Sequence, residues 1–342
     1  MLKQILIVLF ILSIQQIFAQ TQPVLNIGER TLTFTDKSRN RPIVTEIWYP
    51  TEDSLKPKDK VFSPFTRKHT VQNGRLPSRK LPLILLSHGT GGGRLTIEWL
   101  AQSLVQSGFI VAAVDHWGNT YEHKLPLEFV KTWERPLDIS FALTALLGEK
   151  ELSRVIDQQR VGAAGFSFGG YTVLALAGAV VNNEALSNYL KTTGKKELEV
   201  PEFPGLSHYL DDSSLIAGSK VIPTLKDNRI RAFFAISPAL GAGFIDKRQV
   251  QEINRPVYII GSQSDSITPV QTNALHFHKL ISGSDYYEFK GKTGHYVMLN
   301  EANEGLKMSA PLIFSDDPSV SRQQVHVEVS RLANEFFKRH LK

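Results

Sequence analysis

The sequence contains no cysteine, and this absence excludes several kinds of protein at once. Without thiols the chain forms no disulfide scaffold, no iron–sulfur cluster and no thiolate-ligated zinc site. It also has no thiol nucleophile, so any nucleophile must be an oxygen or an amine. Long hydrophobic runs are missing as well: the most prominent one, residues 5–14, ends at Gln15.

The N-terminal residues 1–19 have the three parts of a secretory signal peptide. Lys3 supplies a charged start, residues 5–14 are apolar, and Ala19 is a small residue suited to cleavage. The alternative is a membrane anchor, but a spanning helix needs about 18 apolar residues. We therefore expect a secreted or periplasmic protein whose residues 20–342 form one domain. That domain is stabilised by its core rather than by disulfides.

The charge balance is basic, with a formal net charge of +6 on 342 residues, 42% of them hydrophobic and 21% charged. This composition is typical of a soluble globular protein. Eight basic residues gather in one Pro-containing stretch: Lys56, Lys58, Lys60, Arg67, Lys68, Arg75, Arg79 and Lys80. A solvated surface loop is the simpler interpretation, and weak attraction to anionic lipid or polymer is the alternative. No nucleic-acid-binding motif accompanies the stretch, so we expect no nucleic-acid partner and at most peripheral membrane association.

The order of apolar segments predicts an α/β fold. Residues 30–35 and 43–49 alternate in polarity and predict an antiparallel pair of strands. Further apolar runs then alternate with helical patterns, which is the rhythm of parallel βαβ units. Those runs are residues 81–87, 109–114, 161–166, 231–237, 256–262 and 286–290. We expect an antiparallel pair of entry strands followed by a parallel sheet of βαβ units.

The rhythm stops between residues 182 and 229, a stretch with three prolines and scattered charges. A connection between a helix and a strand usually needs only about 2 to 6 residues. We therefore predict a cap-like insertion that carries some helix of its own, such as residues 184–191, and lies over the strand ends. The alternative is a flexible excursion away from them.

The strongest local signal is the sequence GFSFGG, residues 165–170, between an apolar strand and a helical segment. A G-x-S-x-G sequence in that setting predicts a sharp strand–turn–helix elbow that exposes the hydroxyl of Ser167. A tight structural turn is the alternative. Serine becomes nucleophilic only when a base removes its proton and an acid orients that base.

His295 is the best placed base, because it follows the last predicted strand. Asp265 follows the strand before it, giving the chain order Ser, acid, His that such elbows use. The other position for an acid, the end of residues 231–237, offers Ser237 and no carboxylate. Asp265 could instead cap a helix near Thr268.

An acyl-transfer site also needs donors for an oxyanion. The glycine-rich residues 87–93 (SHGTGGG) follow a strand and are similar to the oxyanion loop of lipases and esterases. We expect the backbone N–H groups of Thr90 and Phe168 to be the donors. A dinucleotide-type phosphate cradle fails because Arg94 stands where a glycine is needed. Pocket walls are expected from His88, Trp117, Ser237 and Tyr296, although residues 115–120 could equally form a structural turn.

Together these segments resemble the α/β-hydrolase superfamily, and within it the group of predicted dienelactone hydrolases related to platelet-activating factor acetylhydrolase. The resemblance runs from about Arg30 to His295 and includes IWYP, SHGTGGG, VAAVDHWGNT, WERPLDISFAL and VGAAGFSFGG. It implies a mostly parallel eight-stranded sheet with helices on both faces, and hydrolysis of carboxylic esters without a cofactor. Two departures stand out: dienelactone hydrolase proper uses a cysteine where this chain has Ser167, and the acetylhydrolase carries its acid at the position of Ser237.

The sequence thus predicts a secreted serine esterase that acts on a small-molecule or lipid ester through Ser167, His295 and Asp265. Three alternatives remain: a phospholipid-directed acetylhydrolase, a serine peptidase on the same fold, and a binding module that has lost catalysis. No metal or cofactor is expected.

Overall fold

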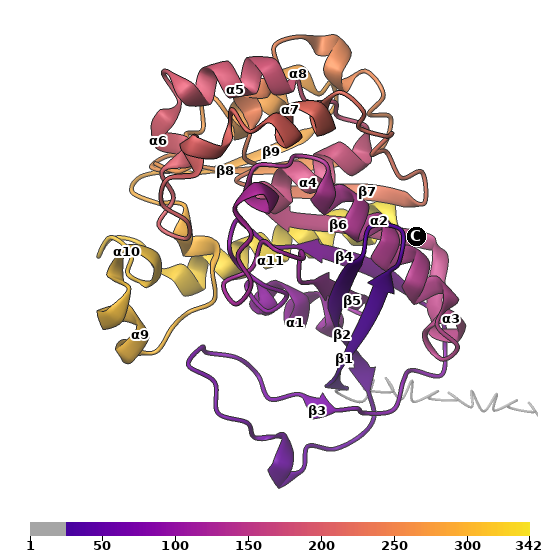
Figure 1. Ribbon diagram of the computed structural model, residues 1–342. Helices are drawn as coiled ribbons and strands as arrows, with labels where there is room; N and C mark the ends of the chain where they lie inside the picture. The colour runs from indigo at the N-terminus through magenta and orange to yellow at the C-terminus, as the bar shows by residue number, and fades with distance from the viewer. Residues whose placement is uncertain (1–24) are drawn as a thin grey trace, which may run out of the picture.

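The computed structural model describes residues 25–342, so the predicted signal peptide lies outside the described residues. Its centre is one twisted sheet of nine strands in the order β3-β1-β2-β5-β4-β6-β7-β8-β9 (Figure 1). The strands are β1 (Asn26–Asp36), β2 (Arg41–Thr51), β3 (Val71–Gln72), β4 (Leu81–Ser87), β5 (Ile110–Val114), β6 (Ile156–Phe166), β7 (Ile230–Ile236), β8 (Val257–Ser262) and β9 (Asp285–Phe289).

Strands β1 and β2 form the antiparallel pair expected from the sequence, and β2 also runs antiparallel to β5. From β5 to β9 every neighbouring pair is parallel. The predicted mostly parallel sheet is therefore confirmed, but its count of eight strands is wrong. The ninth strand, β3, pairs with β1 through only two residues inside the basic stretch. Two residues are too few to produce an alternating pattern, so the sequence gives no signal for it.

Helices cover both faces of the sheet. On one face, α1 (Glu98–Gln106) lies against α11 (Arg322–His340). The other face is covered by α2 (Glu134–Gly148), α4 (Phe168–Ala177) and α8 (Ala274–Leu280). The remaining helices are α3 (Leu152–Val155), α5 (Asn183–Lys191), α6 (Lys195–Leu198), α7 (Ser213–Ser219), α9 (Glu304–Ser309) and α10 (Pro311–Phe314). Six short 3₁₀ turns, from Pro57–Asp59 to Tyr296–Met298, complete the described residues.

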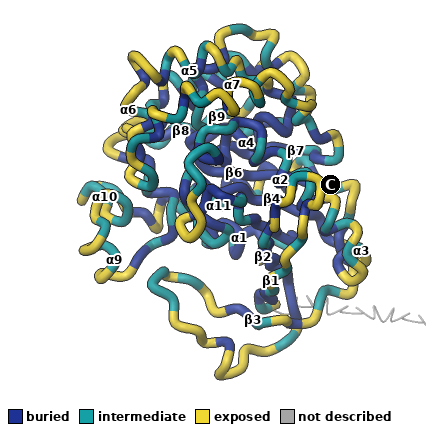
Figure 2. The backbone as a smooth tube through the Cα atoms, in the orientation of Figure 1, coloured by how far each residue is buried: buried dark blue, intermediate teal, exposed yellow. Residues whose placement is uncertain are grey.

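Two hydrophobic cores lie on the two faces of the sheet, and β4 contributes to both. Its side chains alternate: Leu83 and Leu85 face α2 and α4, whereas Ile84 and Leu86 face α1 and α11. A strand buried on both faces reads as a continuous apolar run, which is the pattern of residues 81–87. Figure 2 shows these central strands as the most buried part of the tube.

The insertion between α4 and β7 contains α5, α6, α7 and a 3₁₀ turn. It has a small hydrophobic cluster of its own, made by Leu186, Leu190, Leu198, Val200, Leu206 and Leu210 together with Phe129 from outside the insertion. Helix α5 begins where Asn182 accepts a hydrogen bond from the Ala185 N–H group at 3.0 Å. The insertion is therefore a folded element with its own core.

The carboxyl ends of the parallel strands meet at one edge of the sheet, and this edge carries the residues singled out from the sequence. Ser87, Phe166, Ser262 and Phe289 end β4, β6, β8 and β9 there. Ligands of open parallel sheets bind at this edge. Within residues 25–342, no helix combines the length and the apolar character that crossing a membrane requires.

Candidate active site

Ser167 lies in the sharp turn between β6 and α4. Its backbone has φ 57° and ψ −119°, a strained conformation for a residue with a side chain. The turn is held by hydrogen bonds from the Ser167 N–H to the Ile236 carbonyl, at 2.9 Å, and from the Tyr171 N–H to the Ser167 carbonyl, at 3.1 Å. Hydrogen bonds to the neighbouring strand β7 and to helix α4 thus hold the strained backbone of Ser167 in place.

The glycines around Ser167 are required by close backbone contacts. A Cβ atom on Gly165 would lie 2.1 Å from the carbonyl oxygen of Gly169. One on Gly169 would lie 2.0 Å from the carbonyl oxygen of Ser87 at the end of β4. Neither contact is possible for a side chain, so the spacing of glycines in the motif follows from how closely the elbow folds onto itself and onto β4.

His295 and Asp265 form a buried pair. The Nδ1 atom of His295 lies 2.7 Å from Oδ2 of Asp265, and both residues are almost fully buried. The Oδ1 atom of Asp265 accepts hydrogen bonds from the N–H groups of Ile267, at 3.0 Å, and Thr268, at 2.7 Å. These bonds fix the carboxylate, which in turn fixes the imidazole ring. With Nδ1–H donating to Asp265, the Nε2 atom is left to accept a proton.

Ser167 and His295 line the same cavity, and the ring of Phe166 packs beside His295 at 4.7 Å between centroids. Within residues 25–342 the Ser167 hydroxyl makes no hydrogen bond to another side chain. The hydrogen bond between a nucleophile and its general base is often long before substrate binds, and it shortens in the complex. The Ser167, His295 and Asp265 positions predicted from the sequence are therefore brought together.

Thr90 and Phe168 flank Ser167 from two segments. Phe168 is the first residue of α4, where backbone N–H groups point out of the helix without partners inside it. Thr90 lies in the loop after β4, and its N–H group has no hydrogen-bond partner among the described residues. Both residues line the cavity with Ser167. The geometry thus presents two free donors and a helix N-terminus, an arrangement that favours negative charge.

The cavity has a volume of about 640 Å³ and is walled mainly by apolar side chains. The insertion supplies one wall: Glu197, Leu198, Val200, Pro201, Glu202 and Leu206. The opposite wall comes from α9 and α10 and from residues 63–67, where Phe65 packs on Phe314 at 5.7 Å between ring centroids. The insertion therefore lies over the strand ends, and the floor between the two walls contains Ser167 and His295.

Two comparisons with known proteins bear on this arrangement. Residues 25–123 match the family model of platelet-activating factor acetylhydrolase, isoform II. A solved structure of a ferulic acid esterase from Streptomyces cinnamoneus is similar over 95% of this chain and 92% of that one, with a TM-score of 0.62 and 19% sequence identity. The chain has the α/β-hydrolase fold. A search of curated protein sequences gives no match.

The predicted likeness to an α/β-hydrolase of the acetylhydrolase type is thereby confirmed. The family model covers the two antiparallel strands, the basic stretch and the loop after β4. In α/β-hydrolase folds the nucleophile elbow and the oxyanion loop lie at the carboxyl edge of the sheet, which is where this chain carries Ser167 and the glycine-rich loop after β4.

Of the four residues expected to form pocket walls in this α/β-hydrolase fold, the structure brings only Tyr296 to the cavity. His88 is buried, with its Nε2 atom 3.2 Å from the His116 N–H group. Trp117 packs under the guanidinium of Arg41 instead. Ser237 is buried, with a backbone φ of 41°, and does not line the cavity. A position after a strand end was the only signal for these three, and it does not specify in which direction a side chain points.

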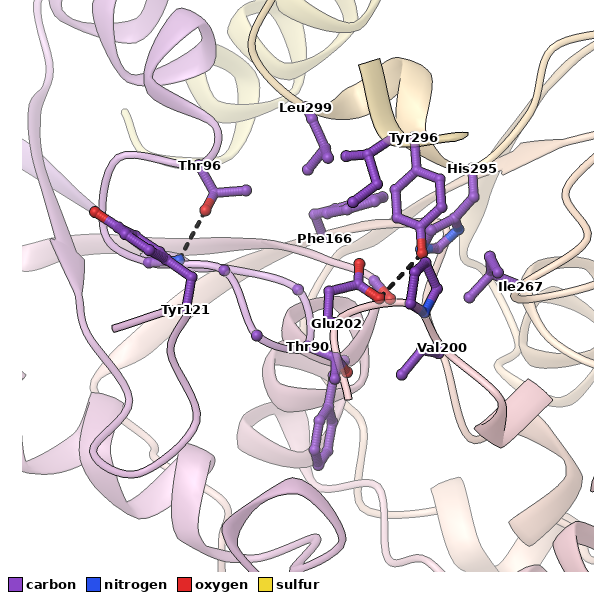
Figure 3. A pocket seen from close by; sticks show the side chains of 18 of the residues that line it. Thr90, Thr96, Tyr121, Phe166, Val200, Glu202, Ile267, His295, Tyr296 and Leu299 are labelled. Carbon is purple, nitrogen blue, oxygen red and sulfur yellow. Dashed lines mark hydrogen bonds between the residues drawn. The ribbon is translucent and has the colours of Figure 1, made fainter. Parts of the chain in front are cut away.

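Glu202 is a cavity residue of the insertion that sequence reasoning missed. Figure 3 shows its carboxylate facing Tyr296, whose hydroxyl donates a hydrogen bond to Oε2 at 3.1 Å. No cation within residues 25–342 forms an ion pair with this carboxylate, and Lys124 donates to the Glu202 backbone carbonyl instead, at 2.7 Å. Burial raises the pKa of the Glu202 carboxyl, and His295 opposes the shift. No pattern marks a single glutamate in an irregular insertion, so only the structure reveals it.

Metal-binding geometry is absent from the described part of the chain. Residues 25–342 contain no group of three or more histidine, aspartate or glutamate side chains placed to hold an ion.

Proposed function

We propose that the protein hydrolyses carboxylic esters, with Ser167 as nucleophile, His295 as general base and Asp265 as its orienting acid. His295 Nε2 takes the hydroxyl proton as the Ser167 oxygen attacks the ester carbonyl. The tetrahedral intermediate expels the alcohol, which receives that proton from His295. Water then attacks the acyl-enzyme by the same route and releases the carboxylic acid.

One observation carries the proposal: a strained serine, a histidine held by Asp265 and two free backbone donors line a single apolar cavity. The N–H groups of Thr90 and Phe168 are the proposed donors to the oxyanion. Removing one such donor from a comparable site costs roughly 10² to 10³ in rate. The apolar walls suit the hydrocarbon part of an ester and exclude water from the developing charge.

The names of the similar proteins agree with an ester substrate. One is an acetylhydrolase and the other an esterase for ferulic acid, and both names imply cleavage at an acyl group. The acetylhydrolase match favours a second candidate function, hydrolysis of acetyl esters of phospholipid type. The cavity volume of about 640 Å³ is ample for an acyl group longer than acetyl, so we place general ester hydrolysis first.

The test is turnover of p-nitrophenyl esters of increasing acyl length by the wild-type protein and by Ser167→Ala. We expect turnover by the wild type, covalent labelling of Ser167 by a phosphonate ester, and loss of both in the variant. Ser213→Ala is a matched control, since Ser213 is an exposed residue of α7 outside the cavity. Full activity in Ser167→Ala would refute the proposal, and turnover restricted to acetyl esters would favour the acetylhydrolase function.

We further propose that the chain is exported and cleaved after Ala19, giving a secreted or periplasmic enzyme. The N-terminal sequence of protein recovered from outside the cytoplasm tests this: it should begin at Gln20. An intact N-terminus at Met1 would contradict cleavage.

A further inference from the structure

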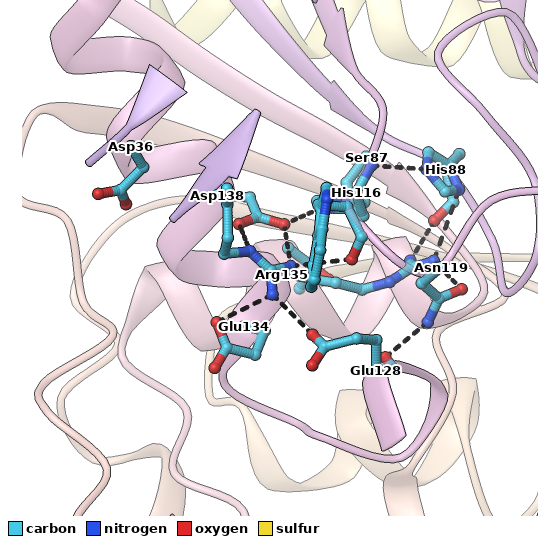
Figure 4. A network of polar contacts seen from close by, with 12 residues as sticks. Asp36, Ser87, His88, His116, Asn119, Glu128, Glu134, Arg135 and Asp138 are labelled. Atoms are coloured by element: carbon cyan, nitrogen blue, oxygen red, sulfur yellow. Dashed lines mark hydrogen bonds and ion pairs between the residues drawn. The ribbon is translucent and has the colours of Figure 1, made fainter. Parts of the chain in front are cut away.

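Arg135 is a buried arginine of α2 that the proposed reaction does not use. Its relative exposure is 1%, and a charge so far from water must be compensated by hydrogen bonds. Its guanidinium donates to the carbonyl of His88 at 2.5 Å, to the carbonyl of Gly89 at 3.0 Å and to Oδ1 of Asn119 at 3.0 Å (Figure 4). Two of these three acceptors are consecutive backbone carbonyls.

Those carbonyls belong to the loop that carries the proposed oxyanion donor Thr90. His88 and Gly89 come directly before it, and Gly91 directly after it donates its N–H to Oδ1 of Asn119 at 2.9 Å. The peptide groups on both sides of Thr90 are therefore tied to Arg135, directly on one side and through Asn119 on the other. This fixes the direction in which the Thr90 N–H group points.

The second proposed donor also contacts this side chain. The central guanidinium carbon of Arg135 lies 4.5 Å from the centroid of the Phe168 ring, a cation–π contact. One side chain of α2 thus touches both segments that supply free N–H groups to the cavity. Burial lowers the pKa of Arg135 to about 9, which leaves the guanidinium charged at neutral pH.

The carbonyl of Gly89 has a second support in the buried histidines. His88 Nδ1–H donates to it at 2.7 Å, and His88 Nε2 accepts from the His116 N–H group. His116 in turn lies between the Asp138 carboxylate and the Ser87 hydroxyl, at 3.1 and 2.8 Å. Burial and the charge of Arg135 lower the pKa of both histidines well below the usual range, so both serve as neutral links.

We propose that Arg135 is a positioning residue for ester hydrolysis, which holds the N–H groups of Thr90 and Phe168 at the separation that an oxyanion requires. The inference rests on the proposed function. A planar fork of donors can hold two adjacent carbonyls at once, whereas an ammonium group is a single point of charge. Arg135 itself does not touch the substrate.

The test compares Arg135→Lys with Arg41→Lys, a matched control. Arg41 is a buried arginine of the same polar network, with 3% exposure, but it contacts Asp138, Glu128 and the Trp117 carbonyl and not the loop. Activity is measured per active site, counted by phosphonate labelling, and unfolding is followed separately. We expect Arg135→Lys to lower kcat about 10²-fold with KM changed less than about threefold, because a donor displaced by about 1 Å loses its alignment.

The control should lose stability and keep kcat. Affinity for a trifluoromethyl ketone, which forms a tetrahedral adduct at the serine, should fall in parallel with kcat in Arg135→Lys. Asn119→Ala gives an independent variant. It removes the acceptor of the hydrogen bond from the Gly91 N–H group, so kcat should fall while KM stays unchanged. If Arg135→Lys does not fold, Asn119→Ala decides the question alone.

Equal kcat values for wild type, Arg135→Lys and Asn119→Ala would overturn the inference. Arg135 would then stabilise the fold without positioning the donors. That result leaves ester hydrolysis standing. No turnover by the wild type would instead refute the proposed function, and the inference with it.

Discussion

A single methyl group added at Gly169 should disable the proposed oxyanion hole. In Gly169→Ala the new Cβ would lie 2.0 Å from the carbonyl oxygen of Ser87 and 2.8 Å from that of His88. Ordinary contact begins near 3.4 Å, so α4 and the end of β4 must separate by about 1.4 Å, the difference between 3.4 and 2.0 Å. Both partners are backbone atoms, and neither can turn aside as a side chain could.

That separation acts on both proposed donors, because Gly169 follows Phe168 and the loop of Thr90 follows Ser87. A misplacement of about 1 Å costs on the order of 10² in rate, and complete loss of one donor costs roughly 10² to 10³. We therefore expect kcat on a p-nitrophenyl ester to fall about 10²- to 10³-fold in Gly169→Ala. KM should change little, because the apolar walls come from other segments.

Gly148→Ala is the matched control. Gly148 is the exposed last residue of α2, and a Cβ there meets nothing within 4 Å. It should leave kcat unchanged and raise stability by up to about 1 kcal/mol. A folded Gly169→Ala protein with wild-type kcat would refute the reasoning, since the contact at 2.0 Å would then be relieved without moving the donors.

Three further predictions concern the ionisable groups. In Asp265→Asn the amide oxygen should keep the N–H groups of Ile267 and Thr268, which turns the amide nitrogen toward His295 Nδ1 and imposes the wrong tautomer. Turnover measured on an activated ester should fall by a factor on the order of 10⁴, and a loss below tenfold would contradict the role of the acid. Glu202 loses its proton above its raised pKa, and the resulting charge opposes an oxyanion. The ratio of kcat in Glu202→Gln to wild type should therefore rise from about one in acid to roughly fivefold at high pH, an effect of about 1 kcal/mol, and a flat ratio would contradict this. Burial raises the pKa of Glu98 to about 7 despite its ion pair with Arg67, so the folded state binds this proton more tightly than the unfolded chain. Stability should decline by about 3 to 4 kcal/mol as pH rises from below about 4.5 to above about 7, and urea unfolding of Glu98→Gln should show this decline removed.

The sequence was sufficient for the features that repeat along the chain. Eight apolar runs marked eight strands, and the expected helix over residues 184–191 appears as α5. The elbow at Ser167 was predictable because its glycines lie directly between an apolar strand and a helical segment, and the Gly165 contact of 2.1 Å lies within the elbow itself. His295 and Asp265 followed from their order after strands.

Features that depend on contacts between distant segments were not predictable. Arg135 reads as an ordinary helical arginine, and only the folded chain brings it to His88, 47 residues earlier. The basic stretch was expected as a loop, yet Arg67 reaches inward to Glu29 and Glu98, at 2.7 Å each. Which side chains reach the cavity was the other gap, as buried Ser237, which does not line it, demonstrates.

The origin of the cavity walls has a consequence for engineering. The walls come from residues 63–67, from the insertion and from residues 306–314, whereas the proposed reacting groups lie in loops and turns that follow strands β6, β8 and β9 of the central sheet. Because the insertion has its own hydrophobic cluster, its cavity-facing positions can be randomised in a library without disturbing the sheet. Leu198, Val200 and Leu206 also belong to that cluster, so Pro201 and Glu202 are the first positions to vary. If the protein is the proposed esterase, its acyl preference can thus be changed while the proposed reacting groups stay in place.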